Sequence, residues 1–255
     1  MSELLQVQGI SKRFGALQAI ELLSFSLNEG EIVGLIGPNG AGKTTAINLI
    51  SGVMRPDRGR VFFGAEDVTG MSPHVLVNRG LVRTFQATTV YQDQTVRENV
   101  LRGAYAKAYP GLAKSLWRGP RGISRHDEAV IDDLLAQLGL AEMAQLTARN
   151  LPYGHQKVLG LAIALAAQPR LMMLDEPAAG LAHDEVVHIE SFIRRANASG
   201  ISVLVVDHNM RFISTLCQRV VVLHHGSELA TGTPQEVTRD QRVIEAYLGT
   251  SHEPA

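Results

Sequence analysis

A glycine-rich segment between an apolar run and a helix-forming run restricts the fold of this chain more than any other feature. The pattern Gly-x4-Gly-Lys-Thr runs from Gly37 to Thr44, and its glycines let successive backbone N–H groups turn inward on phosphate oxygens. Lys43 supplies a charge for the β- and γ-phosphates, and the threonine hydroxyl can ligate Mg2+. The run 32–36 is typical of a buried strand, and 45–50 of a helix whose N-terminus favours an anion. The sequence therefore predicts a loop that binds ATP or GTP.

Charge, cysteine content and hydropathy limit the possible classes of protein. The chain has 255 residues, a formal net charge of −1 and one cysteine, Cys217, so nothing indicates bulk affinity for nucleic acid, and an internal disulfide is excluded. The longest apolar stretch, 158–167, is too short to span a bilayer, and the N-terminus has no signal-peptide pattern. The nine histidines lack metal-ligand spacing. We expect a cytosolic protein with, at most, a peripheral role at a membrane.

Strand-like runs at both ends of the chain enclose a helical middle. Residues 1–30 hold two such runs with turns at Gly15 and 28–30, which predicts an antiparallel edge sheet. From about Thr95 to Ala167 the pattern is helical and opens with a capping box. Within it, 109–125 mixes glycine, proline and basic residues, so a variable surface loop is favoured over a membrane-facing amphipathic segment. Further strands are expected at 59–64, 81–86, 171–174, 201–206 and 220–223, with a hairpin at Gly226 and a capped terminal helix from Thr233.

Two acidic residues follow the buried strand 171–174. Asp175 and Glu176 stand where its four apolar residues end, and neighbouring strand residues point to opposite sides of a sheet. In P-loop NTPases, the first acid at this edge of the sheet holds Mg2+ through water, and the second can polarise the attacking water. Asp207 and His208 follow the next strand in the same way, and an imidazole there can hydrogen-bond a γ-phosphate. We expect these groups to meet the glycine-rich loop.

These motifs, in their order along the chain, resemble the ATP-binding subunits of ABC transporters over essentially the whole sequence. The family pattern consists of an aromatic residue that stacks on adenine, the Walker A loop, the Q-loop glutamine, the signature segment, the Walker B aspartate, the catalytic glutamate, the D-loop and the switch histidine. They stand here as Phe14, 37–45, Gln86, 151–156, Asp175, Glu176, 179–182 and His208.

The resemblance implies an α/β fold with a P-loop NTPase (RecA-like) core, an N-terminal antiparallel β subdomain and an inserted helical subdomain. We expect a single ABC ATPase domain over 1–250, with the helical subdomain at approximately 90–165, and a tail at 251–255.

The resemblance also implies the site residues and the cofactors, ATP and Mg2+. Catalytic roles fall to Glu176, His208 and Gln86, and Mg2+ ligation to Thr44, Gln86 and Asp175. Residues expected to contact the nucleotide are Phe14, Gly37, Pro38, Asn39, Gly40, Ala41, Gly42, Lys43, Thr44 and Thr45. The signature residues Pro152, Tyr153, Gly154 and His155 would cover the phosphates held by a second subunit. ATP would thus join two subunits, and its hydrolysis would let them separate.

Two residues depart from the family pattern. Pro152 replaces the signature serine and has neither a hydroxyl nor a backbone N–H, so it cannot donate to a phosphate. Ala182 replaces the D-loop aspartate. Gly154 keeps an N–H in the loop, and a helix expected from Gln156 onward still directs its N-terminus at the phosphate. We expect a weakened or subfamily-tuned clamp on the phosphates that remains active.

Within the family, the chain resembles the ATPases of branched-chain amino acid importers. The resemblance lies in 109–125, 151–154, 176–181, 207–210 and 246–249. It implies a second ATP-binding subunit (identical or different), integral permease subunits, a periplasmic solute-binding protein and no nucleic-acid partner. The chain would lie peripherally on the cytoplasmic face of the cell membrane. Urea or amide importers and the lipopolysaccharide-export ATPase share much of this pattern, so they stay open as alternatives.

Two further classes are less well supported. Soluble ABC ATPases of DNA repair carry long coiled coils, and no sustained heptads occur between Gln86 and Leu151. Those of translation carry two cassettes, and this chain has one glycine-rich loop of the required spacing. A phosphotransferase is disfavoured by the signature segment and Gln86. The sequence therefore favours a transporter ATPase.

Overall fold

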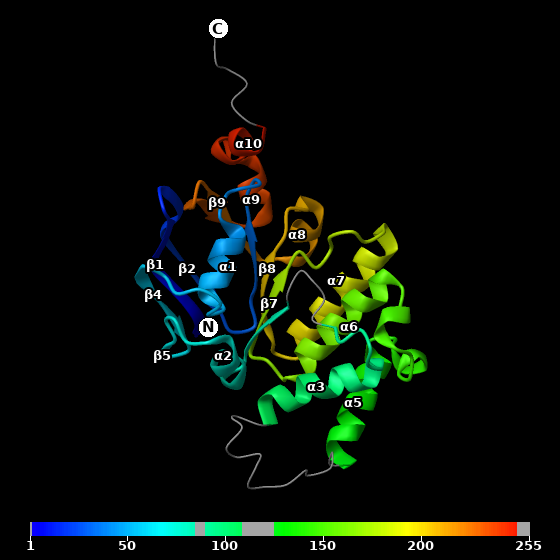
Figure 1. Ribbon diagram of the computed structural model, residues 1–255. Helices are drawn as coiled ribbons and strands as arrows, with labels where there is room; N and C mark the ends of the chain where they lie inside the picture. Colours follow the sequence, from blue (N-terminus) through cyan, green and yellow to red (C-terminus); the bar gives the residue numbers. More distant parts are fainter. Residues whose placement is uncertain (1, 85–89, 109–124, 249–255) are drawn as a thin grey trace.

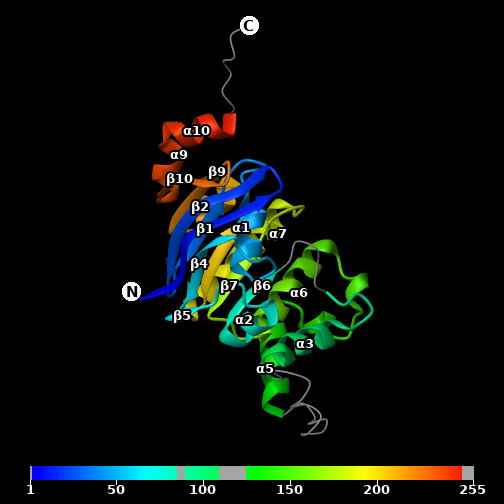
Figure 2. The ribbon, with the colours of Figure 1, turned by 60° about the vertical axis from the view of Figure 1, so that its left-hand side comes forward.

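The computed structural model describes residues 2–84, 90–108 and 125–248. Two β-sheets lie on either side of helix α1, and further helices cover the outer face of the larger sheet (Figure 1 and Figure 2). The strands are β1 (Glu3–Phe14), β2 (Leu17–Asn28), β3 (Ile32–Ile36), β4 (Arg58–Phe63), β5 (Glu66–Asp67), β6 (Leu81–Thr84), β7 (Leu171–Asp175), β8 (Ser202–Val206), β9 (Arg219–His224) and β10 (Ser227–Gly232). The helices are α1 (Lys43–Ile50), α2 (Pro73–Arg79), α3 (Val96–Ala108), α5 (Arg125–Gln137), α6 (Tyr153–Ala166), α7 (His183–Ala198), α8 (Met210–Leu216), α9 (Pro234–Arg239) and α10 (Gln241–Leu248).

The smaller sheet is antiparallel and has the strand order β2-β1-β4-β5. β1 pairs with β2 from Glu3 opposite Asn28 to Phe14 opposite Leu17. The tight turn between them places Gly15 at a φ of 59°, in the left-handed region that glycine adopts without a steric penalty. The predicted N-terminal antiparallel sheet is confirmed, with strands longer than the apolar runs indicated.

The larger sheet has the order β10-β9-β3-β8-β7-β6 and is parallel except for the β9–β10 hairpin. All five residues of β3 are buried, because both faces of this sheet are covered. Ile32 and Ile36 pack into the core on the face covered by α6, α7 and α8, whereas Val33 and Leu35 pack into the core shared with α1 and the smaller sheet. The alternation places α1 directly between the two sheets.

The helices α3, α5 and α6 come between β6 and β7 in the chain, as the helical pattern from Thr95 to Ala167 predicts. The capping box at the start of α3 is confirmed: the Thr95 N–H donates to the Glu98 carboxylate at 2.8 Å, and the Glu98 N–H donates to the Thr95 hydroxyl at 3.1 Å. Val96 and Val100 of α3 share a buried core with Leu159 of α6. This packing fixes the direction of α6, whose first turn carries the signature residues.

Three helices, α2, α7 and α8, were not among the predicted elements. In α7 the buried residues Ile189, Phe192, Ile193 and Ala196 recur at helical spacing, so the signal was present in the sequence. Helix α8 has seven residues and begins at Asn209, whose side chain accepts the N–H groups of Arg211 and Phe212. A helix of seven residues is too short for its apolar residues to show a clear helical period in the sequence.

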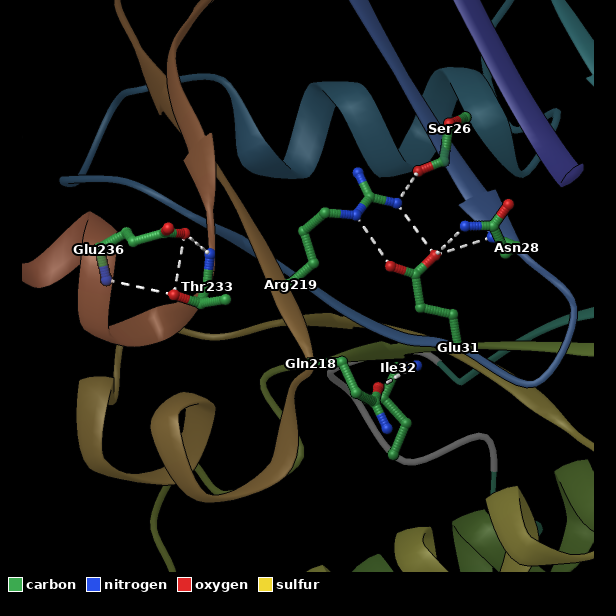
Figure 3. A network of polar contacts seen from close by, with 8 residues as sticks. All are labelled: Ser26, Asn28, Glu31, Ile32, Gln218, Arg219, Thr233 and Glu236. Carbon is green, nitrogen blue, oxygen red and sulfur yellow. Dashed lines mark hydrogen bonds and ion pairs between the residues drawn. The ribbon is translucent and has the colours of Figure 1, made fainter. Parts of the chain in front are cut away.

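A partly buried polar network joins the two sheets near the start of β3 (Figure 3). Arg219 donates to both carboxylate oxygens of Glu31, at 2.8 and 3.0 Å, and to the Ser26 carbonyl of β2 at 2.7 Å. The Asn28 N–H also donates to Glu31, at 2.8 Å. Burial acts to raise the pKa of the Glu31 carboxyl, but the hydrogen bonds from Arg219 and Asn28 outweigh burial and hold that pKa below its ordinary value.

Glu31→Gln should therefore lower the free energy of unfolding by about 1.5–3 kcal/mol at neutral pH, the range for hydrogen bonds to charged groups. Because the pKa of Glu31 is lowered in the folded state, the stabilisation is present above the unfolded pKa of about 4.3 and is lost as pH falls through the folded value. Urea unfolding at several pH values, with exposed Glu21→Gln as control, checks this. If the difference in the free energy of unfolding between Glu31→Gln and the unchanged protein stayed constant down to pH 3, the prediction would be wrong.

Candidate functional site

The carboxyl ends of β3, β7 and β8 lie level with one another at one edge of the larger sheet. Leu35 of β3 pairs with Val206 of β8, and Val206 also pairs with Asp175 of β7. Each strand therefore delivers its following segment to the same place: the glycine-rich loop after β3, Glu176 after β7, and Asp207 after β8. The edge is where open α/β sheets bind ligands. The expected meeting of the loop and the acidic residues is confirmed.

A cavity of about 380 Å³ opens at this edge. It brings together residues of the loop, the adenine-stacking candidate Phe14 and the proposed catalytic Glu176. Its lining consists of Phe14, Leu17, Gln18, Ala19, Asn39, Gly40, Ala41, Gly42, Lys43, Thr44, Thr45, Glu176, His225 and Gly226. Gly37 and Pro38 do not line the cavity; their carbonyl groups instead accept hydrogen bonds from Lys43, at 2.7 and 3.0 Å.

Lys43 is a buried cation beside three carboxylates. Its side chain reaches back over the loop, and the residue is 8% exposed. Burial lowers the pKa of the Lys43 ammonium, and the charges of Glu176, Asp175 and Asp207 oppose that shift. The ammonium thus stands where the sheet edge concentrates negative charge, and the first turn of α1, with its free backbone N–H groups, begins at the same residue.

Asp175 is almost fully buried and is paired with an arginine that was not predicted as a site residue. Its Oδ2 accepts a hydrogen bond from Arg83 at 2.8 Å, and the two side chains are 2% and 7% exposed. Its Oδ1 has no hydrogen-bond partner among the residues that the structure describes. Burial raises the pKa of the Asp175 carboxyl, and the Arg83 guanidinium opposes the shift.

Glu176 lines the cavity, and His208 lies close to it. The His208 Nδ1 lies 3.6 Å from the Glu176 Oε1, with the side chains 58% and 29% exposed. Glu176 has a φ of 48°, in the left-handed region that costs a non-glycine residue energy, and its N–H donates to the Val206 carbonyl at 2.7 Å. Asp207, by contrast, is buried, and burial raises its pKa. Asp175 and Glu176 therefore occupy different environments, because β7 ends at Asp175 and the chain turns away from the strand at Glu176.

The signature residues form the first turn of α6 and lie away from the cavity. The helix begins at Tyr153 and not, as expected, from Gln156, because Pro152 is the N-terminal cap and its carbonyl accepts the Gln156 N–H at 3.1 Å. A proline with a φ of −54° suits a position just before a helix. Gly154 and His155 therefore belong to the helix itself. None of the residues 152–155 lines the cavity.

The D-loop packs against this helix start. Ala182 caps α7 without a side-chain acceptor, and its N–H donates to Glu185 at 2.8 Å. A Cβ on Gly154 would stand 2.0 Å from the Glu185 Oε1, so a larger residue there would displace the Glu185 side chain. A Cβ on Gly180 would meet the ring of Tyr153 at 3.2 Å. The two departures from the family pattern, at Pro152 and Ala182, thus occur at helix starts that touch each other.

Several cavity residues were not predicted. Leu17, Gln18 and Ala19 belong to β2, and His225 and Gly226 form the turn of the β9–β10 hairpin. The Gly226 N–H donates to the Ala41 carbonyl at 2.9 Å, which ties this turn to the loop. Gly226 was expected at a hairpin, but no spacing in the sequence connects a turn after β9 with a loop after β3.

Gln86, assigned catalytic and Mg2+-binding roles by resemblance, lies outside the described residues, as does most of the segment 109–125. Within 2–84, 90–108 and 125–248, no helix combines the length and apolar character needed to cross a bilayer. In the same ranges, no three His, Cys, Asp or Glu side chains group into a metal site of their own.

Comparison with known proteins gives consistent matches. Residues 20–179 match the family model described as ABC transporter, and residues 228–253 match that of the branched-chain amino acid ATP-binding cassette transporter. The chain is 37% identical over 249 residues to the high-affinity branched-chain amino acid transport ATP-binding protein LivG of Salmonella typhimurium, with 96% of this chain and 98% of that protein covered. It is 36% identical over 249 residues to the lipopolysaccharide export system ATP-binding protein LptB of Acidithiobacillus ferridurans, with 98% of each covered.

A crystal structure of the ADP conformation of an ATP-binding cassette of an ABC transporter gives the same fold. It has a TM-score of 0.87 and 30% sequence identity, with 98% of this chain and 100% of that chain covered. The resemblance to the ABC family and to its branched-chain amino acid branch is confirmed, and so is the predicted α/β P-loop NTPase fold. The chain belongs to the ABC transporter family of ATP-binding proteins and is an ABC ATPase.

Proposed function

We propose that the chain energises import of branched-chain amino acids across the cytoplasmic membrane. Support for this solute comes from the likeness to LivG over nearly the whole chain and from the match of residues 228–253 to the branched-chain amino acid family model. The observation that carries the ATPase role is the cavity in which the glycine-rich loop faces Glu176.

Each residue of the site has a proposed task. Backbone N–H groups of 39–45 bind the phosphates, Lys43 exchanges its loop carbonyls for phosphate oxygens, and Phe14 stacks on adenine. The Glu176 carboxylate accepts a proton from the attacking water, and the water oxygen forms a bond to the γ-phosphorus as the bond to the β–γ bridging oxygen breaks. His208, 3.6 Å from Glu176, hydrogen-bonds the γ-phosphate. A catalytic or metal-binding role for Gln86 stays a prediction.

The residues at the sheet edge fit Mg2+. The Oδ1 of Asp175 is buried without a partner among the described residues, and Thr44 presents a hydroxyl in the first turn of α1 beside the cavity. Oxygen donors of this kind, completed by phosphate and water, suit the octahedral preference of Mg2+. When bound, the ion neutralises phosphate charge. Thr44 and Asp175 are the proposed ligands.

A second ATP-binding subunit completes the proposed site. Residues 152–155 do not line the cavity of their own chain, so their contact with phosphate requires another copy or a related subunit. The start of α6 would direct the N–H groups of Gly154 and His155 at the γ-phosphate of that partner. Binding of ATP then holds two subunits together, and hydrolysis releases them, which gives the two states of a switch.

The remaining partners follow from the proposed transport role. The association and separation of the ATP-binding subunits would change the conformation of integral permease subunits, and a periplasmic binding protein would deliver the solute. The chain would lie on the cytoplasmic face of the membrane. We propose that residues 1–250 act as one ATPase domain, with a helical subdomain at about 90–165 that contacts the permeases. Lipopolysaccharide export is the second candidate function, favoured by the 36% identity to LptB.

Purification of the tagged chain from its native membranes tests this proposal. We expect integral membrane proteins to co-purify, and we expect the complex, in proteoliposomes with its binding protein, to accumulate labelled leucine only when ATP is present. Urea serves as the control solute. A complex that carries no leucine but extracts lipopolysaccharide would replace the first function with the second. Absence of any membrane partner would contradict both.

Pro152→Ser should tighten the ATP-held dimer by less than about tenfold. The added hydroxyl can donate one hydrogen bond to a phosphate oxygen, worth about 1.5–3 kcal/mol at most. Proline also fixes the backbone before Tyr153, and loss of that rigidity offsets part of the gain. Light scattering of the ATP-bound Glu176→Gln protein, with and without the change, measures it. Loss of dimerisation with serine would show that the clamp requires Pro152 and is not weakened by it.

A further inference from the structure

We propose that Arg83 is a positioning residue that holds the Asp175 carboxylate in place for Mg2+, an inference that rests on the proposed Mg2+ role of Asp175. Arg83 lies on β6, the strand next to β7, and its side chain is 7% exposed. One of its nitrogens donates to the Asp175 Oδ2 at 2.8 Å. That contact uses one carboxylate oxygen and leaves Oδ1, buried and without a partner in the described part of the chain, for the ion.

The guanidinium is itself held from the helix that follows the phosphate-binding loop. Another nitrogen of Arg83 donates to the Asn48 side-chain oxygen at 2.6 Å and to the Ser51 hydroxyl at 3.1 Å, and both acceptors lie on α1 or at its end. A planar group fixed at three points has little freedom to rotate. Arg83 thus joins three elements, α1, β6 and β7, at the sheet edge.

The bridge relates the two proposed Mg2+ ligands to each other. Thr44 and Asn48 are four residues apart on α1 and therefore lie on the same face of that helix. Because Asn48 contacts Arg83, and Arg83 contacts Asp175, the face of α1 that carries Thr44 is tied to the Walker B strand. Displacement of either ligand would disturb the other through this chain of contacts.

Burial of the Arg83–Asp175 ion pair costs free energy, and a role in orienting Asp175 for Mg2+ accounts for that cost. Removing a carboxylate and a guanidinium from water is offset only when their geometry is good and their other hydrogen-bonding groups are satisfied. Here the Asp175 Oδ1 stays unsatisfied in the described residues, so the pair alone does not complete the site. Groups that orient metal ligands are typically worth about tenfold to a hundredfold in metal affinity.

The test separates Mg2+-dependent from Mg2+-independent nucleotide binding. ATP affinity is measured by calorimetry in the Glu176→Gln protein, once with excess EDTA and once with saturating MgCl2; the ratio of the two dissociation constants is the Mg2+ gain. Arg83→Gln should reduce this gain about tenfold or more while leaving affinity in EDTA within about twofold. Arg83→Lys, which keeps the charge but not the fork of donors, should give an intermediate gain. The control Arg79→Gln breaks an Arg–carboxylate pair with Glu66 on the surface and should change nothing.

An unchanged Mg2+ gain in folded Arg83→Gln would overturn the inference. An equal loss of ATP affinity in EDTA and in MgCl2 would also overturn it, because that result marks a purely structural role. If Arg83→Gln does not fold, Asn48→Ala decides: it removes the brace on the guanidinium and should lower the gain, and an unchanged gain overturns the inference. Asp175→Asn distinguishes failure of the role inferred for Arg83 from failure of the Mg2+ role proposed for Asp175. If it too leaves the gain intact, the proposed Mg2+ role of Asp175 fails; if it abolishes the gain when Arg83→Gln does not, only the role of Arg83 fails.

Discussion

Replacing Glu176 with glutamine is expected to lower ATP turnover roughly a hundredfold or more while ATP affinity stays close to that of the unchanged protein. Glutamine keeps the size and the hydrogen-bonding shape of the side chain but lacks the basic carboxylate that accepts a proton from water. Because the residue lines the cavity beside Lys43, ATP binds without being cleaved, and the ATP-held dimer accumulates. Single-turnover phosphate release and equilibrium binding measure the two effects separately.

Glu190→Gln is the matched control, because Glu190 is a carboxylate on α7 that contacts Thr215 and does not line the cavity. It should leave turnover unchanged. Near-normal turnover in Glu176→Gln would contradict the assignment of the base. His208, the neighbour at 3.6 Å, would then be the group to test next.

Lys43→Ala is expected to abolish most nucleotide binding. The ammonium makes the charge-assisted contacts with the β- and γ-phosphates, each worth about 1.5–3 kcal/mol, so affinity for ATP should fall at least tenfold to a hundredfold. Three carboxylates near the ammonium make the loss larger, since without it their charge repels the phosphates. Fluorescence titration with a labelled ATP measures the change.

Arg60→Ala serves as control for the loss of one positive charge, because Arg60 is exposed on β4 and pairs weakly with Asp67 at 3.9 Å. Its ATP affinity should equal that of the unchanged protein. Thermal unfolding without nucleotide shows whether Lys43→Ala still folds. If a folded Lys43→Ala protein bound ATP as before, the assignment of the glycine-rich loop as the phosphate-binding element would be wrong.

The parts of the fold that could be predicted are those encoded over a few neighbouring residues. The buried strands β3, β7 and β8 are short apolar runs, and the loop 37–45 has a spacing that only a phosphate-binding turn requires. The capping boxes at Thr95 and Thr233 are equally local and are confirmed. Because parallel strands end at a common edge, their order along the chain was enough to place Asp175 and Glu176 near the loop.

The parts that could not be predicted depend on contacts between distant segments. Arg83 reads as one polar residue in a short strand, and its importance appears only when β6 lies beside β7 and across from α1. The turn at His225 and Gly226 reaches the cavity because β9 pairs with β3. The start of α6 was placed too late, because glycine and histidine are weak helix formers, and tertiary packing against α7 overrides that propensity.

The most direct test of the proposed site is a crystal structure of the Glu176→Gln protein with Mg-ATP. We predict the triphosphate against the N–H groups of 39–45, adenine on Phe14, Mg2+ between Thr44 and the Oδ1 of Asp175, and residues 152–155 of a second subunit over the γ-phosphate. Electron density for the triphosphate away from this loop, or an ion that neither touches Asp175 nor is joined to it by a water, would contradict the proposed mechanism.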